Sequence, residues 1–406
     1  MTKHLIPPIA LSLALFACDS DRSTGPGGLG GADPSMGCDV DGGCPGTGPG
    51  TDPNGEDPGN PGQGSVAVLG GGTHVADGLT IEELVSAADG LSIPRDLALN
   101  PERPDELWIV NRGGNATVVV TGLGTPAQQS SRRAAAGASH FMAQPAALAF
   151  GDPGIFATAL EEDQITQPTT PADFMGPTLW TADLAIFDGG HGGHLDMLHN
   201  SPNGVGIAWD KGNAYFLFDG YHQSITWYDF AEDHGPGGSY HGDGTVIRYV
   251  EGEVAYAPDI PSHMEKDAET GLLYVADTGN QRIAVLDITN AVEAGPTAPN
   301  YDGGKQVKAT GASLTTLVDG QALGTDDATL TMSTPSGLEL HDGMIFVTDN
   351  ATSRIFAFDK GGRLIDWLSL AGTVKNGSLM GLTFDSAGRI LIVDAWDNRV
   401  LRIAAP

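Results

Sequence analysis

The sequence predicts an all-β fold built from repeats. From about residue 65 onward, short apolar runs alternate with turns rich in Gly, Asp and Asn, which is the pattern of strands joined by tight loops. No part of this region has the spacing of a long amphipathic helix. One pattern of three strands recurs about six times, and self-similarity of this kind indicates a repeat architecture.

The repeat is clearest towards the C-terminus. Each copy begins with Pro or a small residue, followed by a short apolar strand and an Asp/Gly turn. A second strand then ends in Asp or Asn, and a polar turn leads to a third strand. Strong copies run through residues 261–285, 333–359 and 380–403. Weaker copies begin near Pro94, Pro145 and Pro202.

The strong copies share one phrase, seen as Val275-Ala276-Asp277 followed by Asn280, Arg282 and Ile283. This phrase resembles the NHL repeat, and the resemblance covers about residues 90–403. It implies a six-bladed β-propeller. The last copy stops after its third strand at Ile403, so the missing outer strand should come from the N-terminal end. We expect residues 65–69 to be this strand, because closing the ring removes an unpaired sheet edge.

The start of the chain predicts export. Lys3 precedes an apolar stretch over residues 5–17, which is too short to cross about 30 Å of hydrocarbon as a helix. It ends at Leu15-Phe16-Ala17-Cys18, which resembles the bacterial lipobox. The resemblance implies that residues 1–18 are a lipoprotein signal and that Cys18 is lipidated. The alternative is an ordinary secretory signal. In the first case the protein is lipid-anchored in the cell envelope, in the periplasm or at the cell surface.

Residues 19–64 separate this signal from the repeats. Gly, Pro, Asp and Ser dominate the segment, so it cannot bury enough apolar surface to fold and should be a disordered tether. The folded domain is then residues 65–406. Cys38 and Cys44 lie in the tether, where a small disulfide loop can close in an oxidising compartment. Residues 65–406 contain no cysteine, which excludes catalysis by a thiol.

The charge of the chain limits its partners. Twenty basic and 51 acidic residues give a formal net charge of −31. This argues against binding to nucleic acid or to anionic lipid surfaces and is compatible with cationic ligands or divalent ions. Membrane contact is then expected through the lipid anchor alone, and we expect the protein to be a monomer.

Histidines cluster in one part of the repeat region, and seven of the eleven lie between residues 191 and 263. In a propeller, the loop into each inner strand and the loop between second and third strands share one face, which we call the channel face. The pattern places His199, His222 and His263 on this face. It places His234 and His241 on the opposite face.

An insertion at residues 160–177 brings Glu161 and Glu162 over the channel face. We interpret His199, His222 and His263, with one of these carboxylates, as a candidate site for a divalent metal, zinc or calcium. The alternative is that these are surface residues of an acidic protein.

One blade suggests an activity. Asp219-Gly220-Tyr221, followed by Ser224, resembles a blade of the peptidyl-amidoglycolate lyase propellers. The resemblance implies a catalytic role for Tyr221 and a zinc ion held by three histidines. The equivalent starts of other blades do not reproduce that histidine triad: they hold Arg95, Ala146, Asn203, Ser336 and Met380.

Two functions from different classes remain. No nucleophile elbow, phosphate loop or dinucleotide fingerprint is present. The repeated Asp and Arg residues, such as Asp277 and Arg282, are best interpreted as structural. The first hypothesis is therefore a binding or scaffolding propeller that takes a ligand or partner protein at its channel face. The second is a metal-dependent lyase or hydrolase that uses the histidines of that face.

Overall fold

The computed structural model describes residues 64–163, 175–189, 193–238, 240–325, 327 and 329–406. The predicted lipidation site Cys18, the cysteines Cys38 and Cys44, and nearly all of the predicted tether lie outside these residues. Within the described part of the chain, no helix is long and apolar enough to cross a membrane.

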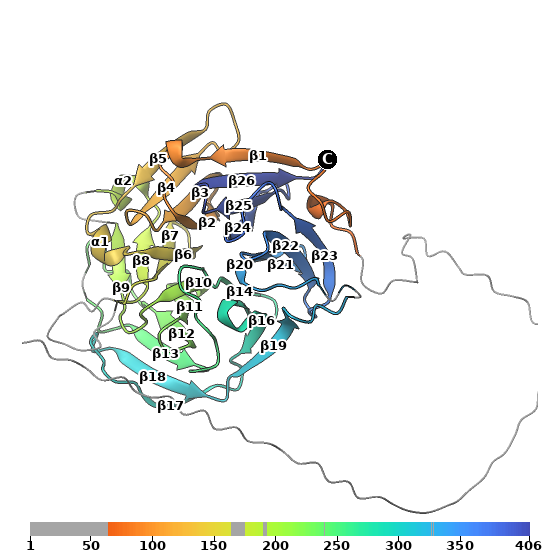
Figure 1. Cartoon of the computed structure of the whole chain (residues 1–406). Helices are drawn as coiled ribbons and strands as arrows, with labels where there is room; N and C mark the ends of the chain where they lie inside the picture. The colour runs from red at the N-terminus through yellow and green to blue at the C-terminus, as the bar shows by residue number, and fades with distance from the viewer. Residues whose placement is uncertain (1–63, 164–174, 190–192, 239, 326, 328) are drawn as a thin grey trace, which may run out of the picture. The chain divides into compact units, whose positions relative to one another are not determined.

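The described chain folds as a six-bladed β-propeller, as the repeat predicts (Figure 1). Blades 1, 2, 4 and 5 are four-stranded antiparallel sheets. Blade 1 comprises β2 (Pro94–Asn100), β3 (Arg103–Asn111), β4 (Ala116–Thr121) and β5 (Gln129–Arg133). Blade 2 comprises β6 (Pro145–Phe150), β7 (Ile155–Leu160), β8 (Thr178–Thr181) and β9 (His194–Met197). Blade 4 comprises β14 (Met264–Lys266), β15 (Leu273–Asp277), β16 (Arg282–Asp287) and β19 (Ser313–Asp319). Blade 5 comprises β20 (Pro335–His341), β21 (Met344–Asp349), β22 (Arg354–Asp359) and β23 (Leu364–Ser369).

Blade 3 is wider than the others. Its own strands are β10 (Gly204–Lys211), β11 (Ala214–Asp219), β12 (Ser224–Asp229) and β13 (Thr245–Tyr249). The connection between the two outer strands of blade 4 adds the hairpin β17 (Val292–Pro296) and β18 (Lys305–Thr310). Strand β18 pairs in parallel with β13, so one blade extends the sheet of its neighbour to six strands.

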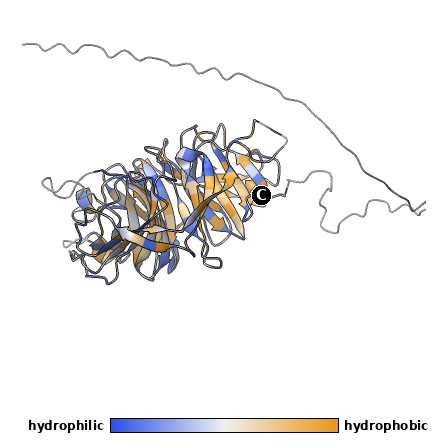
Figure 2. Cartoon of the chain, turned by 90° about the horizontal axis from the view of Figure 1, so that it is seen from below, coloured by the Kyte–Doolittle hydropathy of each residue, from blue (hydrophilic) through white to orange (hydrophobic). Residues whose placement is uncertain are grey.

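Short helical turns precede β1 or join some of the strands. They are η1 (Ala67–Leu69), η2 (Ala87–Asp89), α1 (Ala138–Phe141), α2 (Leu184–Phe187) and η3 (Thr278–Asn280). The apolar residues gather along the strands (Figure 2). They pack in clusters between adjacent blades, one of which joins Trp108 of blade 1 to Phe156 and Phe187 of blade 2 with ring centroids 4.9 and 5.1 Å apart. The core of the domain is therefore a ring of interfaces between blades.

The N-terminal closing strand exists, but it lies further along the chain than predicted. Blade 6 consists of β24 (Leu379–Phe384), β25 (Ile390–Asp394), β26 (Arg399–Ala404) and β1 (Thr80–Val85). Figure 1 shows β1, in orange, beside β26, in blue, and the two are antiparallel with Thr80 opposite Ala404.

The prediction that residues 65–69 form this strand is wrong. Ala67–Leu69 is the 3₁₀ turn η1, which ends at Gly70 in the left-handed conformation (φ 91°). The Val66 amide donates to Asp366 of blade 5 (2.8 Å), and Leu69 is fully buried beside blades 5 and 6. The left-handed glycines that follow turn the chain away, so the strand forms only after this segment.

The repeated aspartates hold loops in place, which confirms the structural interpretation. Asp277 accepts hydrogen bonds from the Ala255 amide, Asn280 Nδ2 and Arg282 Nε, each at 2.8 Å. Asp394 accepts from Arg399 Nε at 2.8 Å in the same way. Both carboxylates are fully buried. A buried carboxylate requires such donors, which explains why an Arg recurs five residues after the Asp.

Candidate functional site in the channel

The six inner strands line the central channel and can be aligned through their pairing. One residue of each inner strand pairs with the residue two positions before the end of the second strand. These residues are Leu97, Leu148, Ile207, Met264, Leu338 and Leu382. All six pack in the apolar clusters between blades or against their edges. Successive side chains of a strand point to opposite sides, so the residues before and after each of them face the channel.

These flanking residues form two rings. The first ring contains Asp96, Ala147, Gly206, His263, Gly337 and Gly381, and the second contains Ala98, Ala149, Ala208, Glu265, Glu339 and Thr383. Most of the twelve positions hold Gly or Ala. The exceptions with titratable side chains are Asp96, His263, Glu265 and Glu339. These four side chains do not recur at the equivalent positions of the other blades, so the structure of the repeat does not account for them. They are therefore the candidate functional residues.

A cavity of about 380 Å³ follows the channel along these strands. It extends from Asp96 and His263 to Pro101, Gly151 and Trp209, at the end where first and second strands connect. At the first ring the inner strands lie against each other: a Cβ added at Gly206 would collide with the Ser262 carbonyl oxygen. The cavity therefore reaches the face opposite to the predicted channel face.

His263 and Asp96 form a buried pair at the inner end of the cavity. His263 Nε2 lies 3.5 Å from Asp96 Oδ1. The same carboxylate accepts the amides of Leu97 (2.7 Å) and Leu148 (2.9 Å). Burial lowers the pKa of His263 and raises the pKa of Asp96. The imidazole is thus held in its neutral form beside a carboxylate, and its Nε2 makes no hydrogen bond within the described part of the chain.

Glu265 and Glu339 lie further along the channel, in adjacent blades. Burial raises the pKa of Glu265 to about 7. Burial, and then the charge of Glu265, raise the pKa of Glu339 well above its usual range. Glu265 accepts the Leu340 amide at 2.6 Å, and Glu339 accepts the Thr383 hydroxyl at 3.2 Å. In the described part of the chain, no Lys, Arg or His nitrogen lies within 4.0 Å of either carboxylate.

The structure does not bring the three predicted histidine ligands together. His199 Nδ1 lies 2.5 Å from Asp302, and His222 Nδ1 lies 2.7 Å from Asp219. With His263 beside Asp96, each histidine contacts a different carboxylate. Among the described residues, one group of three potential metal-binding side chains has ligand atoms within 4.8 Å of one another. That group contains none of these histidines.

The predicted carboxylate ligands contact other parts of the protein. Glu161 is buried, forms an ion pair with Arg112 and accepts the Tyr256 hydroxyl (2.7 Å) and the Asp259 amide (2.6 Å). Glu162 accepts Gln144 Nε2 at 2.8 Å. Both side chains therefore support loops around the channel.

Tyr221 lies outside the channel cavity. Its side chain is 56% exposed and borders a separate cavity of about 190 Å³ with His222, Arg248 and Pro299. The position that the lyase resemblance makes catalytic is thus apart from the His263–Asp96 pair.

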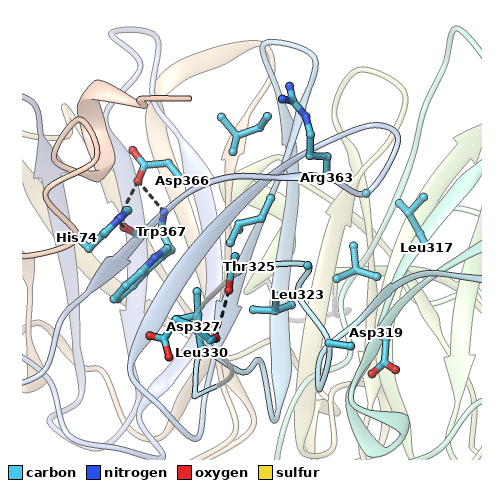
Figure 3. Close-up of a pocket in the computed structure, with 16 residues that line it drawn as sticks. His74, Leu317, Asp319, Leu323, Thr325, Asp327, Leu330, Arg363, Asp366 and Trp367 are labelled. Carbon is cyan, nitrogen blue, oxygen red and sulfur yellow. Dashed lines mark hydrogen bonds and ion pairs between the residues drawn. The ribbon is translucent and has the colours of Figure 1, made fainter. Parts of the chain in front are cut away.

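A larger cavity of about 610 Å³ lies between the outer strands of blades 4 and 5 (Figure 3). His74 forms part of its wall, stacks on Trp367 with ring centroids 4.4 Å apart and pairs with Asp366 at 3.2 Å. Arg363 pairs with Asp359 at 3.1 Å. These charged groups are partnered within the protein, whereas Glu265 and Glu339 have no cationic partner among the described residues. The channel is therefore the better candidate site.

Sequence reasoning found His263 but missed Asp96, Glu265 and Glu339. A signal was present in the strong copies, because Glu339 occupies the same position in its blade as Thr383 in the next. The weak copies obscure the rest of the alignment, since the start of β14 differs from the other inner strands.

The architecture defines a six-bladed β-propeller with a polar cavity in its channel. No family model and no curated protein sequence matches the chain. Solved propellers share its fold. An auxiliary nutrient binding protein from Bacteroides ovatus has 14% identity and a TM-score of 0.51, with 80% of this chain and 76% of that chain covered. A second such protein, from Bacteroides thetaiotaomicron, has 10% identity and a TM-score of 0.48, with 77% and 68% covered. A streptogramin B lyase has 11% identity and a TM-score of 0.46, with 81% and 98% covered. Likeness at these identities establishes the fold alone.

Proposed function

We propose that this chain is a binding protein of the cell envelope whose channel cavity takes a small, positively charged ligand. The observation that carries the proposal is the pair Glu265 and Glu339, two half-buried carboxyl groups of one cavity whose pKa values are raised and which, among the described residues, have no Lys, Arg or His nitrogen within 4.0 Å. Burying carboxylates is unfavourable unless an opposite charge or hydrogen-bond donors compensate. A bound cation supplies that compensation.

The cavity has the dimensions and the walls of a small-molecule site. Its volume of about 380 Å³ falls in the range of ligand pockets, roughly 300–1,000 Å³. Gly and Ala at most ring positions leave space beside the two carboxyl groups. The net charge of −31 attracts cations towards the molecule.

The N-terminal sequence supports an envelope location for this binding protein. We propose that Cys18 is lipidated, that Cys38 and Cys44 form a disulfide in the tether, and that the NHL-type propeller acts as a monomer held away from the membrane. The ring of blades closes on itself through β1, so none of its blades needs a second chain to complete its sheet.

Calorimetric titration with 1,4-diaminobutane tests the proposal, and calcium chloride serves as a divalent probe. We expect the diamine to bind the wild type and to lose at least tenfold in affinity for Glu265→Gln and Glu339→Gln. Glu269→Gln is the matched control, because its side chain is 87% exposed. Equal affinity for all four proteins, or no binding of either probe, would contradict a cationic ligand in the channel.

The second candidate function is a metal-dependent lyase or hydrolase, and the His263–Asp96 pair favours it. A neutral imidazole beside a carboxylate can accept a proton or bind a metal ion. Binding of calcium but not of the diamine, with loss in both Glu→Gln variants and in His263→Asn, would favour this alternative over the binding protein.

A further inference from the structure

A second group of metal-ligand side chains lies away from the channel, where blade 3 meets blade 2. Asp196 belongs to β9, the outer strand of blade 2. His234 and Asp243 belong to residues 230–244, the connection between β12 and β13 of blade 3 (Figure 1). One potential ligand atom from each of the three lies within 4.8 Å of the other two.

The three side chains have the chemistry of a divalent transition-metal site. An imidazole nitrogen and two carboxylate oxygens form a mixed set suited to zinc, and the two carboxylates balance the charge of the ion. Zinc binds such ligands at about 2.0–2.2 Å, so ligand atoms of one ion lie roughly 3–4 Å apart. His234 Nε2 already lies 3.1 Å from Asp243 Oδ1. A metal ion would replace the proton that these two groups share.

Asp196 gives an independent indication of a ligand. Its side chain is fully buried, and Oδ2 has no hydrogen-bond partner among the residues that the structure describes. The other oxygen, Oδ1, accepts the Met197 amide and contacts His241 Nδ1, each at 2.7 Å. A buried carboxylate oxygen without a partner is costly. Contact of His241 with Oδ1 leaves Oδ2 available, which is how outer partners orient metal-binding carboxylates.

The position of the group gives an ion both access and a role. Asp196 is buried, whereas the side chains of His234 and Asp243 are 20% and 28% exposed, so an ion can enter from the side of the loop. The loop is otherwise attached to β9 by polar contacts such as Gly237 N to His194 O at 2.9 Å. A metal ion here would link blade 2 to the loop of blade 3.

We propose that Asp196, His234 and Asp243 bind one zinc ion, with His241 as the residue that positions Asp196, and that this ion clamps the 230–244 loop of blade 3 to blade 2. The site is separate from the channel cavity and does not depend on the proposed cationic ligand. His234 and His241 are the two histidines that the sequence pattern places on the face opposite to the predicted channel site.

Zinc titration of the full chain, purified without a histidine tag and stripped with a chelator, tests the site. Cys18, Cys38 and Cys44 are replaced in every variant, so that thiols cannot bind the metal. We expect one zinc ion per chain, a rise in Tm on binding, and at least a hundredfold loss of affinity for His234→Ala and Asp243→Asn. His241→Ala should lose about 10–100-fold, as outer partners of metal ligands do.

His222→Ala is the matched control, because it removes another histidine that pairs with an aspartate. This control should bind zinc like the parent. The circular dichroism of each variant without zinc shows whether it folds, and Asp243→Glu provides a conservative variant if Asp243→Asn does not. Wild-type affinity in both His234→Ala and Asp243→Asn would overturn the site, as would absence of zinc binding by the parent chain. Loss of zinc in His263→Ala alone would place the metal in the channel and overturn it too.

Discussion

Glu265 and Glu339 occupy equivalent positions on the inner strands of neighbouring blades, and the charge of Glu265 raises the pKa of Glu339. Burial acts in the same direction on both groups. Two like charges close together in one channel are unfavourable, so the surroundings of the two glutamates favour protonated carboxyl groups. A cationic ligand of the proposed kind would displace these protons, so its binding should depend on pH.

The first prediction concerns stability against pH. The folded state holds a proton on Glu265 up to about pH 7, whereas the unfolded chain releases it near 4.5. The stabilisation from this proton is complete below pH 4.5 and is lost as the pH rises through 7. A shift of this size corresponds to about 3 kcal/mol. We therefore expect the free energy of unfolding of the wild type to fall from pH 5 to pH 8 by more than that of Glu265→Gln.

Urea unfolding at several pH values measures this difference. Glu269→Gln should follow the wild type, because Glu269 is exposed. Parallel pH profiles for wild type and Glu265→Gln would show that the carboxyl group is ionised in the folded state like an ordinary surface glutamate.

Ring closure provides the second prediction. A chain that begins at Ser86 lacks β1 and leaves the edge of β26 unpaired, so its Tm should fall by about 10 °C or more. A chain that begins at Thr73 keeps β1 and loses only η1, which packs beside blade 5. Hydrogen exchange separates the two cases: the amides of Arg402 and Ala404, which face β1 opposite Glu82 and Thr80, should lose protection only in the shorter chain. Equal protection in both chains would mean that β1 does not close the ring.

The sequence predicted the fold because each blade repeats the same local devices. The Asp at the end of the second strand and the Arg five residues later, as in Asp277 and Arg282, mark the turns of strong blades. The closing strand was misplaced because residues 65–69 are more apolar than Thr80–Val85, which contains two glutamates. Only the contact of Val66 with Asp366, far away in sequence, decides between them.

The candidate site was harder to predict for a physical reason. A channel residue is defined by the register of six strands, and a shift of one residue moves a side chain to the other side of its strand. His263 was identified because histidine is rare, but Glu265, two residues later, is one of many acidic residues. His199 contacts Asp302, which belongs to the connection between β17 and β18, and this hairpin could not be placed from the repeat.

The third prediction concerns the anchor. Cys18→Ala should move the protein from the membrane fraction to the soluble exported fraction, because the lipid is the expected means of attachment. Thermal unfolding of the released protein should match that of the wild type, since the tether separates Cys18 from the propeller. Immunoblotting of membrane and soluble fractions measures the change, and Cys38→Ser is the control that should remain in the membrane. Retention of Cys18→Ala in the membrane would contradict the lipobox interpretation.

The last prediction distinguishes a structural Glu161 from a metal-binding one. Glu161→Gln keeps an oxygen for the Tyr256 hydroxyl and the Asp259 amide but removes the negative charge beside Arg112, whose side chain is only 19% exposed. Breaking a buried ion pair leaves a buried charge without its partner. Arg112 retains its ion pair with Asp259 at 2.5 Å. The expected loss in the free energy of unfolding is therefore about 2 kcal/mol, below the usual range of about 3–5 kcal/mol for a fully buried pair.

The control variant Glu162→Gln should lose less than about 1 kcal/mol of stability, because Glu162 is only partly buried. Chemical unfolding measures both variants, and metal content is measured on the same samples. If Glu161→Gln keeps its stability and loses a bound zinc or calcium ion, Glu161 is a metal ligand and its contact with Arg112 is incidental.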